Sequence, residues 1–333
     1  MAAPRPPSSG DKPTSDGRPP SSSGGAAPRQ TAPAVLMVRP AHFFVDPDTA
    51  STNSLQPAAA ARADHVREAR VEFDRLANAL DFAGVRVCVQ PAAPDRELPD
   101  AEFPNNWVSL HADGTAVLYP MLAPRRRLER DRAILTALQR DFGFAIRRTI
   151  DLSSLEERGE VVEGTGSLVL DHVQRLAYAT LSPRTTEAGV EAACQAIGYR
   201  PVMFRAQHAS GAAIYHTNVM LSIGTKVALG CFASIRDEGE RARVVNSLSD
   251  SGREIVDVSE SQMLAFAANC LELDADGQPL MAISQRAWDS LGFGQRRSIE
   301  RGAAICAVAV DTIENIGGGG VRCMLAEISL PRR

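Results

Sequence analysis

The sequence predicts an α/β protein assembled from five similar units, each made of one helix and a few strands. A succession of helix, glycine and strand occurs five times along the 333 residues. The glycines that end the five helices are separated by 59, 55, 54 and 50 residues: Gly84, Gly143, Gly198, Gly252 and Gly302. Even spacing of this kind indicates an internal repeat, and ordinary α/β alternation with coincidental spacing is the alternative. An apolar content of 44% is enough for a substantial core.

The first unit begins at an apolar run, residues 34–38, which is typical of a buried strand. Apolar residues recur at near-helical spacing over residues 59–82 and predict an amphipathic helix. Gly84 follows at the position of a helix C′ glycine, and residues 85–89 then predict a second strand.

The other four units repeat this order. The predicted helices cover residues 126–142, 186–197, 238–248 and 287–301, the last interrupted near Gly292 and Gly294. The strands predicted to follow them cover residues 144–146, 199–202, 254–256 and 305–308.

Residues 1–32 differ from the rest of the chain. They contain Pro, Ser, Gly and Ala with a few charges and no large apolar side chain, so they cannot bury enough surface to offset chain entropy. We therefore expect a disordered tail over 1–32 and a single domain over 33–333. A transit peptide is the alternative, but Asp11 and Asp16 interrupt the stretch and no amphipathic helix is visible.

Composition excludes several classes of partner. The net charge is −4, whereas surfaces for nucleic acid or anionic membranes normally carry a basic excess. No run of 18 apolar residues occurs, so no membrane span is expected. The six cysteines form no CxxC pair, which favours a reducing, cytoplasmic setting. The histidines show no HxH or HExxH spacing, and we expect neither a metal nor an organic cofactor.

Each unit carries a polar or reactive residue 17–22 positions after its glycine. These residues are Asn106, Glu163, His216 (with Asn218), Asn269 and Cys323. If the units surround a pseudo-rotation axis, equivalent points converge on that axis. A cysteine, a histidine, a carboxylate and several amides would then share one cleft, as nucleophilic catalysis requires.

Local sequence supports the same residues. Cys323 follows four consecutive glycines, which permit close approach of a ligand and an exposed thiol; a buried structural thiol is the alternative. Strand alternation predicts that His216 and Asn218 share one face. Glu163 precedes a Gly-x-Gly turn that no predicted helix follows. We expect the other five cysteines to lie in the core.

Taken together, these motifs resemble a known superfamily, the guanidino-group-modifying enzymes or penteins. The resemblance covers residues 33–332 and is greatest to the citrulline-utilisation hydrolases (citrulline ureidases). It is carried by Phe-Pro-Asn-Asn-Trp at 103–107, Tyr-His-Thr-Asn at 215–218 and Arg-Cys-Met-x-Ala-Glu-Ile at 322–328. It implies a five-bladed α/β propeller of strand-strand-helix-strand units, a small amino-acid substrate and a homodimer.

The resemblance also implies roles for single residues. Cys323 matches the nucleophile, His216 the general acid and base, and Glu163 the carboxylate beside that histidine. Arg184 matches an arginine that holds the substrate carboxylate, and Arg126 or Arg127 matches a second one. The remaining candidates for substrate contacts are Asn105 and Asn269, with Asn53, Gln56 and Asp100 as candidates for holding the α-amino group.

The chain departs from the deiminases of this superfamily at two positions. Asn106 and Asn218 stand where those enzymes place aspartates against a cationic guanidinium. A ureido group is neutral and offers both a carbonyl acceptor and N–H donors, which an amide can match. We therefore expect hydrolysis of L-citrulline to ornithine, ammonia and carbon dioxide through an S-carbamoyl intermediate. The alternatives are a deiminase or amidinotransferase acting on arginine or a methylated arginine, and a non-catalytic binding protein.

Overall fold

The computed structural model describes residues 1, 28–53, 55–56 and 65–333. Within them, the strands form five triplets with one pairing pattern, an antiparallel pair followed by a parallel pair. In order, the triplets are β15 (Ala326–Ile328), β1 (Ala34–Arg39) and β2 (Arg86–Pro91); β3 (Val108–Leu110), β4 (Thr115–Leu118) and β5 (Arg148–Asp151); β6 (Val169–Asp171), β7 (Leu176–Thr180) and β8 (Arg200–Phe204); β9 (Leu221–Ile223), β10 (Val227–Gly230) and β11 (Glu254–Asp257); and β12 (Leu271–Ala275), β13 (Gln278–Ser284) and β14 (Ala304–Val308).

The first two triplets join into one six-stranded sheet of order β2-β1-β15-β3-β4-β5, and the other three are separate sheets. The junction is a parallel pairing of β15 with β3 that places Ile328 opposite Leu110. The two ends of the chain thus meet in one triplet, because β15 pairs with β1. This is the α/β repeat that the glycine spacing predicts; closure into a five-bladed propeller stays a prediction.

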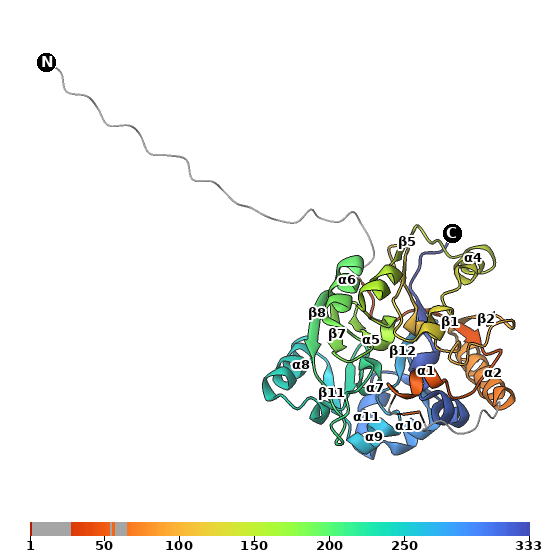
Figure 1. The fold of residues 1–333 in the computed structure, drawn as a ribbon. Coiled ribbons are helices and arrows are strands. Elements are labelled where there is room, and N and C mark those ends of the chain that lie inside the picture. Colours follow the sequence, from red (N-terminus) through yellow and green to blue (C-terminus); the bar gives the residue numbers. More distant parts are fainter. Residues whose placement is uncertain (2–27, 54, 57–64) are drawn as a thin grey trace.

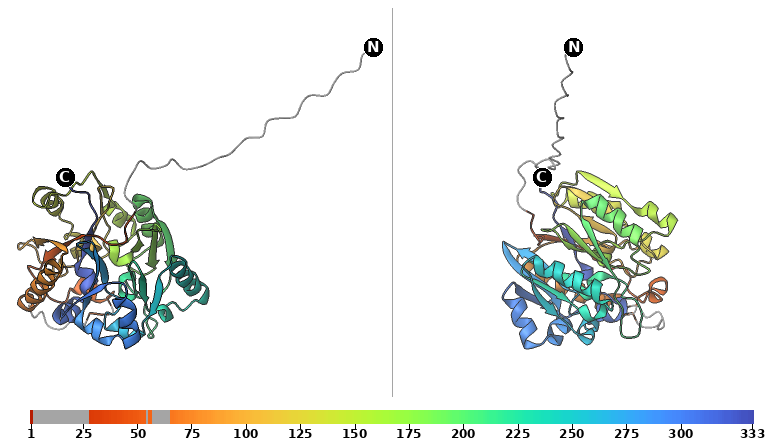
Figure 2. Two further views of the ribbon diagram at one scale, coloured as in Figure 1. Left: turned by 180° about the vertical axis from the view of Figure 1, so that it is seen from behind. Right: turned by 90° about the vertical axis from the view of Figure 1, so that its left-hand side faces the viewer.

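Eleven α-helices are present in the described residues. They are α1 (Pro47–Ala50), α2 (Val66–Phe82), α3 (Pro124–Arg127), α4 (Arg132–Arg140), α5 (Gly164–Ser167), α6 (Glu187–Ile197), α7 (Thr217–Met220), α8 (Glu238–Asp250), α9 (Glu260–Leu264), α10 (Gln285–Ser290) and α11 (Phe293–Glu300). The long helices α2, α4, α6 and α8 lie toward the periphery, whereas the single-turn helices α1, α5 and α7 lie nearer the middle (Figure 1). The views from behind and from the side show the same outer position for α2, α6 and α8 (Figure 2).

Two predicted elements differ from the structure. The helix predicted over 126–142 is two helices, α3 and α4, because the Asp131 side chain accepts a hydrogen bond from the Ala133 amide and starts a new helix there. The strand predicted over 144–146 is wrong. Phe144 makes only an isolated bridge to Arg332, and the strand β5 begins at Arg148.

Most of the predicted tail, residues 2–27, lies outside the described residues, as do residues 59–64 of the first predicted helix. The last residues of the predicted tail pack on the fold. Gln30 is buried and donates hydrogen bonds to the carbonyls of Leu170 and Ile223 at 2.9 and 3.2 Å, and Ala32 is also buried. Contacts with the fold therefore begin before residue 33.

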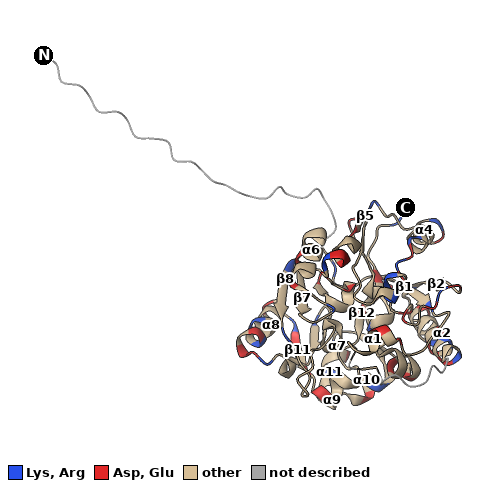
Figure 3. Cartoon of the chain, in the orientation of Figure 1, with Lys and Arg blue, Asp and Glu red and all other residues tan. Residues whose placement is uncertain are grey.

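The outer helices carry charges of both signs, interspersed along α2 and α8 in the view of Figure 3. Among the described residues, no helix combines the length and the apolar character that a bilayer crossing would need.

Candidate active site

The short strands β3, β6, β9, β12 and β15, which we call the leading strands, place the predicted residues together. Asn106 and Asn269 each stand two positions before a leading strand, and Cys323 stands three before β15. Glu163 and His216 reach β6 and β9 through the single turns α5 and α7. Side chains far apart in sequence thus meet at one end of these strands.

A small cavity lies at this end. Its lining residues include Cys323, His216, Asn106, Arg126, Arg184 and Asp100. Its volume is about 10 Å³, room for about one water molecule. An amino acid can therefore enter only if lining segments shift.

Two amides hold the sulfur of Cys323. The Nδ2 of Asn269 lies 3.3 Å and the Nδ2 of Asn218 lies 3.4 Å from Sγ. Burial raises the pKa of the Cys323 thiol, and these two hydrogen bonds oppose that rise. The expectation of an exposed thiol is wrong, since Cys323 is only 4% exposed, but it borders the cavity with His216 rather than lying sealed in hydrocarbon.

His216 is paired with Glu163. Its Nε2 lies 2.8 Å from the Oε2 of Glu163, and both side chains are buried. Burial lowers the pKa of His216 to about 4, against the opposing effect of Glu163. At neutral pH the ring is therefore uncharged. With Nε2–H donating to the carboxylate, Nδ1 is the basic nitrogen.

Glu163 is ionised although it is fully buried. Burial by itself would raise its pKa, but Arg184 and the hydrogen bond with His216 lower the pKa to about 2. Guanidinium nitrogens of Arg184 and Arg126 lie 3.7 and 3.8 Å from Oε2. The negative charge of Glu163 is thus balanced from within the site.

Of the two arginines proposed as the second carboxylate ligand, Arg126 borders the cavity and Arg127 does not. Arg126 binds both oxygens of Glu129 at 3.0 Å and donates from Nη1 to the Oδ1 of Asn106 at 2.8 Å. Arg127 instead donates to the carbonyls of Met121 and Leu122.

Asn106 is fixed at both ends of its amide. Its Oδ1 accepts from Arg126, and its Nδ2 donates to the Oδ1 of Asn105 at 3.0 Å. Gly166 permits this packing, because a Cβ there would lie 2.5 Å from the Nδ2 of Asn106 and 2.8 Å from the Nδ1 of His216. Asn105 itself does not border the cavity.

Sequence reasoning missed the residues that hold Arg184. Its guanidinium donates to the Thr52 hydroxyl and to the Thr49 carbonyl, with one contact at 2.8 Å and two at 3.0 Å, and it stacks over the Tyr215 ring at 5.0 Å. Tyr215, in turn, donates to the carbonyl of Gly318 at 2.6 Å. Only Tyr215, inside the Tyr-His-Thr-Asn motif, carried a signal in the sequence.

The three α-amino candidates separate in the structure. Asp100 and Asn53 border the cavity, whereas Gln56 donates to the Gly317 carbonyl behind it. The Oδ1 of Asp100 is buried and has no hydrogen-bond partner among the described residues. Burial raises the pKa of Asp100 to about 6, although Arg126 opposes the rise.

One detail of the sequence prediction is wrong. His216 and Asn218 do not share a strand face, because Thr217–Met220 form the helical turn α7 and His216 precedes it. The Gly-x-Gly segment after Glu163 is itself the four-residue turn α5, and the strand β6 rather than a helix follows it. Each turn nevertheless directs its residue to the site, Glu163 to His216 and Asn218 to Cys323.

The described residues contain no group of three or more His, Cys, Asp and Glu side chains arranged to hold a metal ion. The site therefore offers a thiol, a neutral imidazole, two carboxylates, three amides and two guanidinium groups.

Comparison with known proteins identifies the class. The chain belongs to the guanidino-modifying, or pentein, superfamily of hydrolases. The family model described as "N,N dimethylarginine dimethylhydrolase, eukaryotic" matches residues 39–330, so the chain belongs to that family. No curated protein matches the chain.

Solved structures share the fold at low identity. The N-terminal domain of ArgZ, an arginine dihydrolase of cyanobacteria, is 16% identical with a TM-score of 0.69, and the match covers 90% of this chain and 98% of that one. Unliganded AgrE is 15% identical with a TM-score of 0.69, and the match covers 90% of this chain and 40% of that one. A dimethylarginine dimethylaminohydrolase in adduct with S-methyl-L-thiocitrulline is 17% identical with a TM-score of 0.61, and the match covers 89% and 99%.

Proposed function

We propose that the protein hydrolyses the ureido group of L-citrulline, giving ornithine, ammonia and carbon dioxide. The observation that carries the proposal is the surrounding of Cys323, whose sulfur is contacted by the amides of Asn218 and Asn269 and, among the residues that the structure describes, by no carboxylate. The buried Oδ1 of Asn218 has no hydrogen-bond partner among the described residues and would accept a ureido N–H.

The charged residues that line the cavity favour a substrate whose reacting group is neutral. The charged residues that line it are two arginines and one aspartate, Arg126, Arg184 and Asp100. The nearby charge of Glu163 is already shared by His216 and both arginines. A cationic guanidinium would therefore find no excess negative charge, whereas a ureido group needs none.

The same residues can orient an amino acid. Arg184 presents an Nη1 that makes no closer contact than 3.7 Å to Glu163, and we assign it to the substrate carboxylate. Asp100, with its unpartnered Oδ1, is assigned to the α-ammonium group. Arg126 is held by Glu129 and donates a hydrogen bond to Asn106. We therefore assign Arg126 to positioning Asn106 and not to contact with the substrate.

In the proposed reaction, Sγ of Cys323 attacks the ureido carbon as the thiol proton passes to Nδ1 of His216. The carbon–nitrogen bond to the δ-amine then breaks, and His216 returns the proton to the departing amine of ornithine. Glu163 stabilises the transient imidazolium. Water, activated by His216, next cleaves the S-carbamoyl group, which restores the thiol and releases carbamic acid, and this breaks down to ammonia and carbon dioxide. No cofactor takes part.

Further properties of the protein form part of the proposal. The five strand triplets are proposed to close into a five-bladed propeller, with residues 33–333 as its single catalytic domain. The protein is proposed to act in the cytoplasm on a small amino acid, as a homodimer.

Hydrolysis of arginine or a methylated arginine is the second candidate. Glu163 favours it, because a buried carboxylate with a pKa of about 2 beside the cavity is a partner that a guanidinium could use. The relative ArgZ is described as an arginine dihydrolase.

Alkylation tests the site and its preference together. Iodoacetamide near neutral pH should label Cys323 selectively, and citrulline should block labelling at lower concentration than arginine. Equal labelling of all six cysteines only after denaturation would contradict an active thiol. Stronger protection by arginine would favour the second candidate.

A further inference from the structure

A second polar cavity lies at the opposite end of the leading strands. It borders residues that directly follow three of these strands: His111 after β3, His172 after β6 and Ser329 after β15. A three-residue strand rises roughly 10 Å, so the cavity is separated from the cysteine end by the length of the strands. Its volume is about 130 Å³, far larger than the cavity at Cys323.

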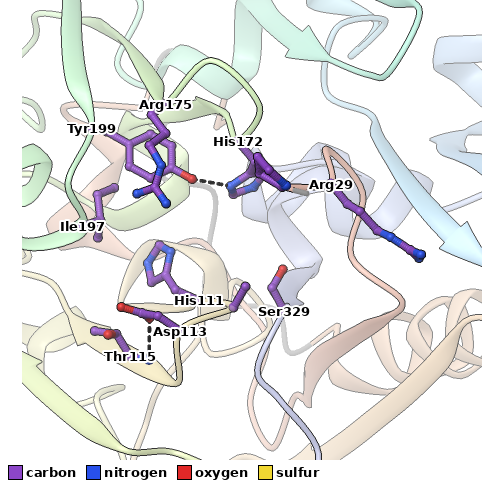
Figure 4. Close-up of a pocket in the computed structure, with 11 residues that line it drawn as sticks. Arg29, His111, Asp113, Thr115, His172, Arg175, Ile197, Tyr199 and Ser329 are labelled. Atoms are coloured by element: carbon purple, nitrogen blue, oxygen red, sulfur yellow. Dashed lines mark hydrogen bonds between the residues drawn. The ribbon is translucent and has the colours of Figure 1, made fainter. Parts of the chain in front are cut away.

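The lining is basic and rich in hydrogen-bonding groups. It includes Arg29, Arg175, His111, His172, Tyr199 and Asp113. Figure 4 shows that these side chains come from separate segments and surround one space, with the histidines on opposite sides of it. We call this cavity the far-end pocket.

Arg175 is an exposed arginine that lines the pocket. Within the part of the chain that the structure describes, no hydrogen bond or ion pair involves its side chain. The other guanidinium of the lining, that of Arg29, is 75% exposed and pairs, among the described residues, with Asp274 at 3.2 Å. An exposed ion pair of that kind contributes little stability and yields easily to another anion.

The one carboxylate of the lining is already engaged. Asp113 accepts from the Thr115 amide at 2.9 Å and pairs with Arg148 at 3.2 Å. Its charge therefore does not neutralise Arg175. The pocket keeps a surplus of positive charge, which a bound anion would balance.

The histidines can add directed hydrogen bonds. The Nε2 of His111 bonds the Ser109 hydroxyl at 2.7 Å, and the Nδ1 of His172 bonds the Tyr199 hydroxyl at 2.7 Å. The Nδ1 of His111 remains for a ligand, whereas the Nε2 of His172 lies 3.9 Å from Glu327 and pairs with that carboxylate. Imidazole and guanidinium donors together are the groups that recognise phosphate and carboxylate oxygens.

We propose that the far-end pocket binds a small anion, either a phosphate or a carboxylate. The volume of about 130 Å³ gives room for a compact oxyanion. The site is separate from the cavity at Cys323, and the proposal does not depend on which reaction that cavity catalyses.

Titration calorimetry on the full chain tests the proposal, with inorganic phosphate, sulfate and citrate added at constant ionic strength. One saturable site is expected. Arg175→Gln and His172→Gln should each weaken binding by about tenfold or more. Arg205→Gln is the matched control, because Arg205 is an exposed arginine outside the pocket and should bind as the wild type does.

The outcomes separate the possibilities. Tighter binding of phosphate and sulfate identifies an oxyanion ligand, and tighter binding of citrate identifies a carboxylate; either supports the site. Absence of saturable binding would overturn it. Binding that citrulline abolishes and Arg175→Gln leaves intact would also overturn it, since the anion would then occupy Arg126 and Arg184.

Discussion

The two ends of the leading strands use similar residues for different purposes. At one end Cys323, His216 and Glu163 fill their surroundings so completely that a cavity of about 10 Å³ remains. At the other end two histidines and two arginines surround about 130 Å³. The near end is built of mutual contacts and the far end of groups with spare hydrogen-bonding capacity. This difference fits the two proposals, a reaction at the near end and ligand binding at the far end.

The largest expected effect is at the near end. Cys323→Ala should lower the turnover of citrulline by roughly a millionfold, to background, because no other group can form the carbamoyl thioester. Ornithine release measures it. The matched control is Cys194→Ala, a buried thiol in α6 whose pKa burial raises to about 12. Full activity in Cys323→Ala would end the nucleophile assignment.

Acid should lower the free energy of unfolding, because His216 is buried in its uncharged form. Burial lowers its pKa to about 4, so between pH 6.5 and 4 only the unfolded chain binds the proton. Stability is therefore lost as the pH falls through this range, by roughly 3 kcal/mol. Denaturant unfolding should show the wild type losing this amount relative to His216→Gln between pH 7 and 4. Parallel curves would contradict the account, because they would mean that folding leaves the pKa of His216 unchanged.

Asn106→Asp tests the amide argument. The carboxylate would lose the hydrogen bond to the Oδ1 of Asn105 and face that oxygen instead. We expect kcat/KM for citrulline to fall about ten- to hundredfold, corresponding to roughly 1–3 kcal/mol. Asn315→Asp is the control, since Asn315 accepts from Arg286 at 2.8 Å on the surface, as Asn106 accepts from Arg126 inside. A gain in citrulline turnover would contradict the account.

The smallest effect is expected at the far end. Burial lowers the pKa of His111 to about 4, and His172, Asp113, Glu327 and Arg148 also act on it. Phosphate in the pocket should raise the pKa of His111 and leave that of His216 unchanged, as followed by NMR of the two imidazoles. Equal movement of both would show that the two ends do not bind separately.

The repeat could be predicted from the sequence because the residue that ends each helix is a local signal. In four of the five units the glycine after the helix lies in the left-handed region, as at Gly84 with φ +96° and Gly198 with φ +71°, whereas Gly302 does not. The broken helix at Asp131 and the turn after His216 carry no such glycine. The break follows from the local cap at Asp131, and the turn depends on a contact outside its segment, the bond from the Thr217 hydroxyl to the Ser167 carbonyl.

The sequence predicted which residues lie together but not which contacts they make. Equal spacing brought Cys323, Asn218 and Asn269 into one list, but their contacts span 105 and 54 residues of sequence. The far-end pocket gave no signal, because His111 and His172 lie in unrelated segments with no metal-ligand spacing. Only the fold, in which β15 pairs with β3 and β6 lies in a separate sheet, brings the residues that follow these strands to one place.

Product analysis tests the central proposal most directly. The protein is incubated separately with L-citrulline and with L-arginine, and ornithine, citrulline and ammonia are quantified. The account predicts ornithine and ammonia from citrulline in equal amounts and little turnover of arginine. Citrulline and ammonia from arginine, with no ornithine from citrulline, would contradict it and make the protein a deiminase.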